Sequence, residues 1–101
     1  MNWKLVGSAT GTTRISLPDN WSELLIYAVD KDYQQAYTFN VVKGVLDLVT
    51  SNRSLIGGGY NTNASYWMGV NVSDTEVWLS SATANGGTDR KASVTVRVYY
   101  K

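Results

Sequence analysis

The chain has 101 residues, of which 44% are hydrophobic and 17% charged, and its formal net charge is +1. These values are typical of one globular domain rather than a disordered segment, and so small a charge supplies no long-range field to attract nucleic acid. Histidine and cysteine are absent, which excludes Ser–His and Cys–His catalysis, disulfides and the usual zinc sites.

Stretches rich in β-branched and aromatic residues alternate with Gly, Asn, Ser and Thr about every 8–12 residues, which indicates a β-sandwich or barrel. No window shows a helical period, so we expect little or no helix beyond a short turn over residues 19–23 after Pro18. In chain order we expect strands at residues 3–6, 13–17, 23–29, 36–43, 46–49, 54–56, 66–72, 76–80 and 92–100. Without crossover helices these strands pair mostly antiparallel. The predicted fold is all-β: a single antiparallel, jelly-roll-like β-sandwich domain over residues 1–101.

Three of these strands carry a clear burial pattern. Residues 23–29 are almost continuously apolar, which predicts a central strand buried on both faces. Residues 36–43 alternate Tyr37, Phe39 and Val41 with Thr38, Asn40 and Val42, which is the period of two that a strand shows. The last strand places its core residues on one face, namely Val94, Val96, Val98 and Tyr100. Its Tyr99 therefore faces the opposite way.

Two Gly-rich stretches interrupt the rhythm. One is residues 57–59 followed by Tyr60 and Asn61, and the other is residues 84–87. Because Gly and Asn tolerate positive φ, we expect both to be loops. Neither resembles a phosphate-binding loop, since no Lys-Ser/Thr and no helix follows.

The remaining chemistry to consider is that of carboxylates. A glycosidase needs two acids across a cleft, and most of the eight acids here fall at predicted turns or strand ends. Asp30 and Asp32 form a D-x-D sequence at which a calcium ion is conceivable, but further oxygen ligands do not lie close by in the sequence. We therefore expect no enzyme, no catalytic residue, no metal and no cofactor.

The aromatic content is high, with four Trp and seven Tyr against one Phe. Both side chains combine a large apolar body with a polar tip, which suits contact surfaces and sugar-stacking platforms. If Ser73 and Asp74 form a two-residue turn, one face of the resulting hairpin belongs to the core: Tyr66, Met68, Val70, Val72, Val77 and Leu79. The opposite face carries Ser65, Trp67, Gly69, Asn71, Glu76, Trp78 and Ser80. In this register Gly69 lies opposite Trp78, with Trp67 as the diagonal neighbour.

This outward face predicts a ligand or subunit contact. Its residues are Trp67, Trp78, Asn71 and Glu76, with Tyr60 and Asn61 from the first Gly-rich stretch. Three interpretations stay open: a subunit contact, which we favour; a saccharide stacked on the indoles; or aromatic residues covered by the protein's own loops. We expect Trp3 and Trp21 instead to close the ends of the core.

Several runs resemble the small β domains of tail and tail-fibre proteins from phages and prophages of Gram-positive bacteria. They are residues 3–8 (WKLVGS), 15–18 (ISLP), 23–26 (ELLI), 58–60 (GGY) and 96–101 (VRVYYK). The resemblance covers the whole chain, but its motifs are structural rather than catalytic.

The resemblance implies a virion component, made in the bacterial cytoplasm, that forms a trimeric β-sandwich on the phage tail. It would attach to a saccharide on the host cell surface or contact other virion proteins during assembly. No coiled coil or shaft is present, so we expect either an excised module or a stand-alone accessory protein. A carbohydrate-binding module of a bacterial protein is the remaining alternative. With no apolar leader and no long apolar run, we expect no membrane insertion.

Overall fold

The computed structural model describes residues 2–46, 52–60 and 65–101. The strands are β1 (Lys4–Thr10), β2 (Ile15–Ser16), β3 (Glu23–Asp30), β4 (Gln35–Val42), β5 (Asn52–Tyr60), β6 (Ser65–Ser73), β7 (Glu76–Ala84), β8 (Thr88–Asp89) and β9 (Val94–Tyr100). Two single turns accompany them, α1 (Lys43–Leu46) and a 3-10 turn (Lys91–Ser93). The predicted all-β fold is confirmed.

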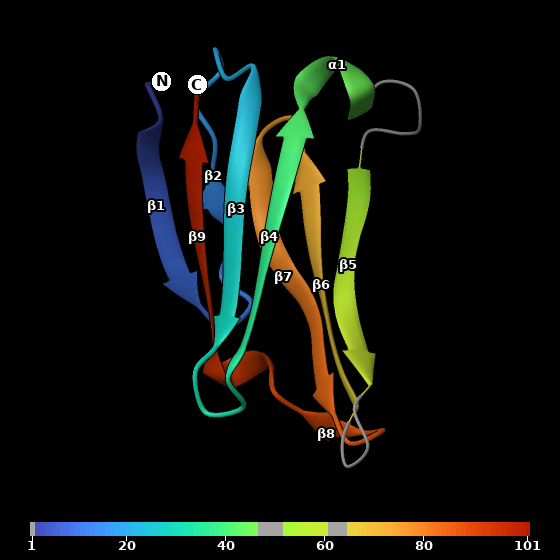
Figure 1. Cartoon of the computed structure of the whole chain (residues 1–101). Helices are drawn as coiled ribbons and strands as arrows, with labels where there is room; N and C mark the ends of the chain where they lie inside the picture. The colour runs from blue at the N-terminus through green and yellow to red at the C-terminus, as the bar shows by residue number, and fades with distance from the viewer. Residues whose placement is uncertain (1, 47–51, 61–64) are drawn as a thin grey trace.

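The strands form two antiparallel sheets packed face to face (Figure 1). One sheet has the order β1-β9-β3-β4 and the other β2-β7-β6-β5, with β8 paired to β7. β1 pairs with β9 in the first sheet and β2 pairs with β7 in the second, so the chain crosses between the sheets after β1 and again before β9. The β3–β4 hairpin lies in the first sheet, and the β5–β6 and β6–β7 hairpins lie in the second.

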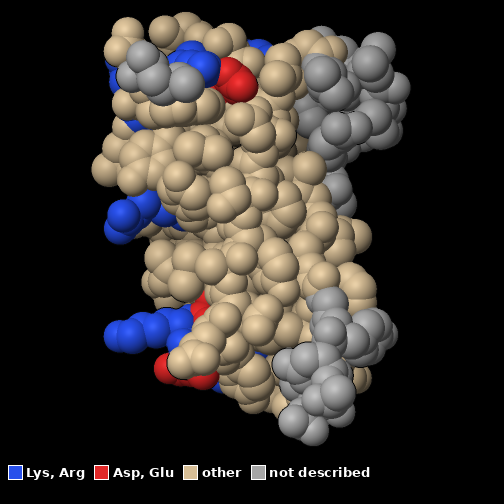
Figure 2. Space-filling view, in the orientation of Figure 1, with Lys and Arg blue, Asp and Glu red and all other residues tan. Residues whose placement is uncertain are grey.

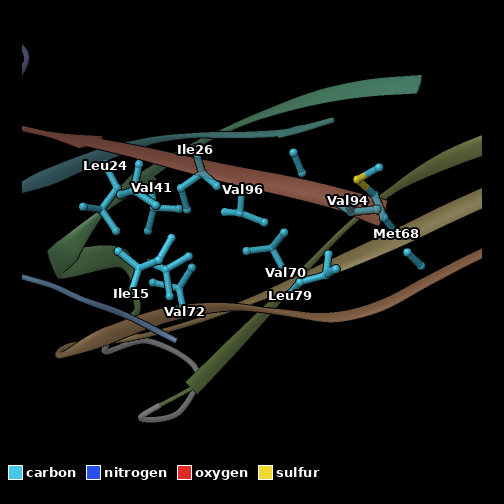
Figure 3. Packing of buried hydrophobic residues seen from close by; sticks show 14 of the residues in the cluster. Ile15, Leu24, Ile26, Val41, Met68, Val70, Val72, Leu79, Val94 and Val96 are labelled. Carbon is cyan, nitrogen blue, oxygen red and sulfur yellow. The ribbon is translucent and has the colours of Figure 1, made fainter. Parts of the chain in front are cut away.

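The core lies between the sheets, where alternate residues of each strand point inward (Figure 3). From the first sheet come Leu24, Ile26, Val41, Val94 and Val96, and from the second Ile15, Met68, Val70, Val72 and Leu79. All ten are buried. Each large aliphatic side chain removed from water contributes about 1.5–3 kcal/mol to folding, so this layer is the main source of stability.

β3 is central, as expected, but it is buried on one face only. Leu24, Ile26 and Ala28 are fully buried, whereas Tyr27 is 37% and Val29 38% exposed. The prediction of burial on both faces is wrong because the outward apolar side chains of this strand face solvent. By contrast, the predicted alternation in residues 36–43 and in the last strand is confirmed.

The first Gly-rich stretch is not a loop, because residues 57–60 continue β5 at the edge of its sheet. The glycines are required by close approach of aromatic rings. A Cβ at Gly57 would lie 2.8 Å from the Tyr37 ring, which reaches it from β4 across the sandwich. The second stretch does form the expected turn, with positive φ at Asn85 (55°) and Gly86 (79°).

The β6–β7 hairpin turns at Asp74 and Thr75 rather than at Ser73 and Asp74. Val72 pairs with Val77, and Ser73 Oγ accepts hydrogen bonds from the backbone N–H groups of Thr75 and Glu76. The register therefore differs by two residues from the expected one. A shift of two leaves each side chain on its predicted face, so the assignment of core and outer faces is correct.

Two further expectations concern short segments. Residues 19–23 form no helix: the Trp21 N–H donates to the Pro18 carbonyl in a turn, and Glu23 begins β3. The predicted strand at 46–49 begins at Leu46, the last residue of α1, and its other residues lie outside the described ones.

Candidate functional site

Among the side chains that the structure describes on the outer face of β5 and β6, Trp67 is a large aromatic one and is 39% exposed. Trp67 pairs with Gly58 of β5. A Cβ at Gly58 would lie 2.5 Å from Trp67 Cε3 and 2.8 Å from Cδ2, so the indole occupies the space where a side chain at position 58 would be. The indole ring of Trp67 therefore packs directly on the backbone of β5.

Ile56 lies on the same outer face and is 69% exposed. It pairs with Gly69, which also lacks a side chain to cover it. We call Trp67, Ile56 and Gly58 the Trp67 patch. The patch is apolar and its residues lie on paired strands, and exposed apolar patches of this kind are common at contact surfaces.

Trp78 lies elsewhere on this face and is covered by the protein itself. The Arg14 guanidinium lies 3.9 Å from the centroid of its ring, and Arg14 Nη1 is 3.1 Å from Glu76 Oε1. Asn71 is its partner across the ladder, in place of the expected Gly69. Asn71 lies four positions after Trp67 along β6, which is about 13 Å. Because Trp78 is opposite Asn71, the two indoles are not neighbours.

The remaining two predicted contact residues give no side-chain geometry. Tyr60 is the last residue of β5 and pairs with Ser65. Asn61 lies outside the described residues. Of the six predicted contact residues, the structure thus assigns Trp67 to the exposed patch, and Trp78 and Glu76 to a separate group around Arg14, with Asn71 opposite Trp78 in the ladder.

The other aromatic predictions have mixed outcomes. Trp21 closes one end of the core, 2% exposed, with Nε1 donating to the Asp74 carbonyl at 2.8 Å. Trp3 does not close the core: it is half-buried outside the core cluster, under the Lys101 ammonium at 4.7 Å from its ring centroid. Tyr100 packs against the core, whereas Tyr99 faces outward against Tyr27, as expected.

Sequence analysis did not identify a buried ionic group at the end of β3. Asp30 is fully buried and is bound by Arg90, whose Nε is 2.9 Å from Oδ2 and Nη2 3.0 Å from Oδ1. Tyr66 Oη donates to Oδ2 at 2.7 Å and the Tyr33 N–H to Oδ1 at 3.3 Å. Asp30 shares the inward parity of Leu24, Ile26 and Ala28, and this was the signal that it needed a partner inside.

The electrostatics of this group follow from those contacts. The Arg90 hydrogen bonds hold the pKa of Asp30 below its ordinary value despite burial, which acts the other way. Burial, together with the bond to Asp30, raises the pKa of Tyr66. Arg90 Nη2 also lies 3.2 Å from Asp32 Oδ2. The two carboxylates of the D-x-D sequence are therefore held by one guanidinium rather than arranged around a cation.

A second feature absent from the predictions is a groove of about 410 Å³ on the outer face of the β1-β9-β3-β4 sheet. We call it the Tyr27 groove, and it is lined by Tyr27, Val29, Lys31, Ser93, Thr95 and Arg97. In the view of Figure 2, Lys and Arg side chains gather on the side of the molecule where β1, β9 and β3 lie, and the middle of this view shows no Lys, Arg, Asp or Glu.

Within the described ranges 2–46, 52–60 and 65–101, no three acidic side chains gather in a way that could hold a metal ion. In the same part of the chain no helix has the length and hydropathy to cross a bilayer. Comparison with known proteins gives no further assignment. No protein-family model, curated protein or solved structure matches the chain.

Proposed function

We propose that the chain is a non-enzymatic attachment module of a phage virion, which binds a saccharide on the surface of the host cell. In this proposal it acts as a homo-oligomer, a trimer according to the resemblance described above, at the tail tip or fibre. The observation that carries the proposal is the exposed indole of Trp67 supported by Gly58. A ring held on a sheet face against the backbone of the neighbouring strand is prepared to stack against a flat apolar ligand surface.

The physical case rests on what an indole offers to a sugar. A pyranose ring presents C–H groups on one face and hydroxyls at its rim, so a large aromatic surface binds the face while nearby polar groups bind the rim. The backbone beneath Trp67 is fixed by pairing on both sides of β6, with β5 and with β7. Little conformational entropy is then lost on binding.

Ile56 supports a second candidate, an assembly domain whose Trp67 patch contacts another subunit or virion protein. A branched aliphatic side chain that is 69% exposed has no polar group for a sugar. It gains instead from burial in a protein interface, at about 25 cal/mol per Å² of apolar surface.

Adsorption to host cells and molecular mass in solution separate these candidates. For attachment, Trp67→Ala lowers adsorption and glycan-array binding while the mass from light scattering stays that of the wild type. For assembly, Trp67→Ala and Ile56→Ser both lower the mass. Trp3→Ala is the matched control, since Trp3 is also partly exposed but lies away from the patch. A wild-type protein that binds neither cells nor glycans overturns the attachment proposal.

A further inference from the structure

The Tyr27 groove lies between two strands whose outward side chains are fixed by register. Tyr27 pairs with Arg97 and Val29 pairs with Thr95, so four of its lining residues form two adjacent rungs of the β3–β9 ladder. Lys31 and Ser93 extend the groove beyond the ends of these strands. A volume of about 410 Å³ falls within the range of about 300–1,000 Å³ that small-ligand sites occupy.

The charged side chains that line the groove are all positive. Lys31 and Arg97 line it and none of the six lining residues is acidic. Neither cation has a carboxylate partner among the described residues, whereas Arg14, Arg90, Lys91 and Lys101 each have one. A paired surface charge gains little from a further anion, but an unpaired one is available to bind it.

The acids next to Lys31 in sequence do not neutralise it, because both are bound elsewhere. Asp30 points into the core, where Arg90 binds both of its oxygens, and Asp32 lies 3.2 Å from the same guanidinium. The buried ionic group therefore leaves the positive charge of Lys31 uncompensated beside the groove.

The walls of the groove are apolar with hydroxyl groups at the side. Tyr27 and Val29 provide the apolar surface, and the Tyr27 ring is held edge-on by Tyr99, with centroids 5.8 Å apart at an interplanar angle of 76°. Ser93 and Thr95 add hydroxyls. Thr95 Oγ1 lies 3.0 Å from Thr10 Oγ1, which still leaves hydrogen-bonding capacity on that oxygen.

We propose that the Tyr27 groove is a binding site for an anionic sugar. The phosphate or carboxylate of the ligand pairs with Arg97 and Lys31, where the planar guanidinium forms two parallel hydrogen bonds to it. The sugar ring lies against Tyr27 and Val29, and its hydroxyls bond to Ser93 and Thr95. This site is on the opposite sheet from the Trp67 patch and does not rest on the proposed function.

The test uses the purified full chain and two small probes, glucose 6-phosphate and neutral glucose. Isothermal titration and NMR shift mapping should show glucose 6-phosphate binding, with shifts at residues 27, 29, 95 and 97, and at least tenfold weaker binding of glucose. Arg97→Gln and Lys31→Gln should each weaken phosphate-sugar binding about tenfold. Binding should also weaken as salt rises, since the groove faces solvent.

The matched control is Arg14→Gln, which removes a cation from the other outer face and should leave the affinity unchanged. Trp67→Ala should also leave it unchanged, which separates this site from the attachment surface. Both groove cations are on the surface, and thermal melting confirms that the variants fold. The proposal is overturned if the wild type binds neither probe, if it binds both equally, or if Arg14→Gln costs as much as Arg97→Gln.

Discussion

The guanidinium of Arg90 binds both carboxylate oxygens of the fully buried Asp30, at 2.9 and 3.0 Å. Arg90 follows the short strand β8, and Asp30 ends β3 in the other sheet. The pair therefore joins the two sheets at one end of the sandwich. A buried charge is costly unless it is paired and hydrogen-bonded, so the neighbours of this pair should matter for stability.

The hydroxyl of Tyr66 is the first such neighbour. It donates to Asp30 Oδ2 at 2.7 Å inside the core. Tyr66→Phe should lower the free energy of unfolding by about 1.5–3 kcal/mol, the usual contribution of a hydrogen bond to a charged group, as measured by urea denaturation. Tyr27→Phe removes a hydroxyl from an exposed tyrosine and should change the free energy of unfolding little. Equal effects of the two substitutions would contradict this role for Tyr66.

Acid should weaken the fold through Asp30. Its folded pKa is lowered by Arg90, so the carboxylate contributes stability that is present above the ordinary aspartate pKa of 3.8 and lost as the pH falls through the folded value. The urea concentration at the unfolding midpoint should stay constant between about pH 7 and 5 and decrease as the pH is lowered further. In Asp30→Asn the protein should be less stable at neutral pH and lose less on acidification. Asp19→Asn, in an exposed turn, is the control, and an unchanged acid slope in Asp30→Asn would refute the assignment.

Gly58 should not tolerate a side chain. A Cβ there would overlap the Tyr66 carbonyl oxygen and lie 2.5 Å from Trp67 Cε3, so either the backbone or the indole must move. Gly58→Ala should destabilise the fold by about 1–3 kcal/mol and alter tryptophan fluorescence. Gly87→Ala is the control, because no atom lies within 4 Å of the added carbon and its φ is not positive. A Gly58→Ala protein with wild-type stability and emission would show that Trp67 does not rest on this strand.

Trp21 and Trp3 should differ sharply in their effect on stability. Trp21 is buried in the core and donates a hydrogen bond to Asp74, so Trp21→Ala should cost about 3–5 kcal/mol. Trp3 lies outside the core cluster, and Trp3→Ala should cost about 1 kcal/mol or less. Urea midpoints measure both. A Trp3→Ala protein as unstable as Trp21→Ala would mean that Trp3 does close the core.

The outward face of the β6–β7 hairpin was predictable because strand parity survives an error of two residues in register. Trp67 and Trp78 were placed on the right side of the sheet although the turn is at Asp74 and Thr75. Their separation was not predictable, since it depends on the register itself and on a bulge between Gly69 and Val70. Glycines 57–59 were misread as a loop because sequence does not distinguish a glycine needed for positive φ from one needed for close approach of a ring.

The sequence by itself determined the fold class, the alternation that builds the core, and the absence of histidine and cysteine chemistry, because composition and a period of two depend only on local order. The tertiary structure decided which outward residues meet. It laid Trp67 over Gly58, covered Trp78 with Arg14, and turned Asp30 and Asp32 toward Arg90. Arg14 and Trp78 are distant in sequence, and so are Arg90 and the two aspartates. Trp67 and Gly58 lie on the two neighbouring strands of one hairpin. Only the pairing of strands and the packing of the two sheets bring such groups within reach of one another.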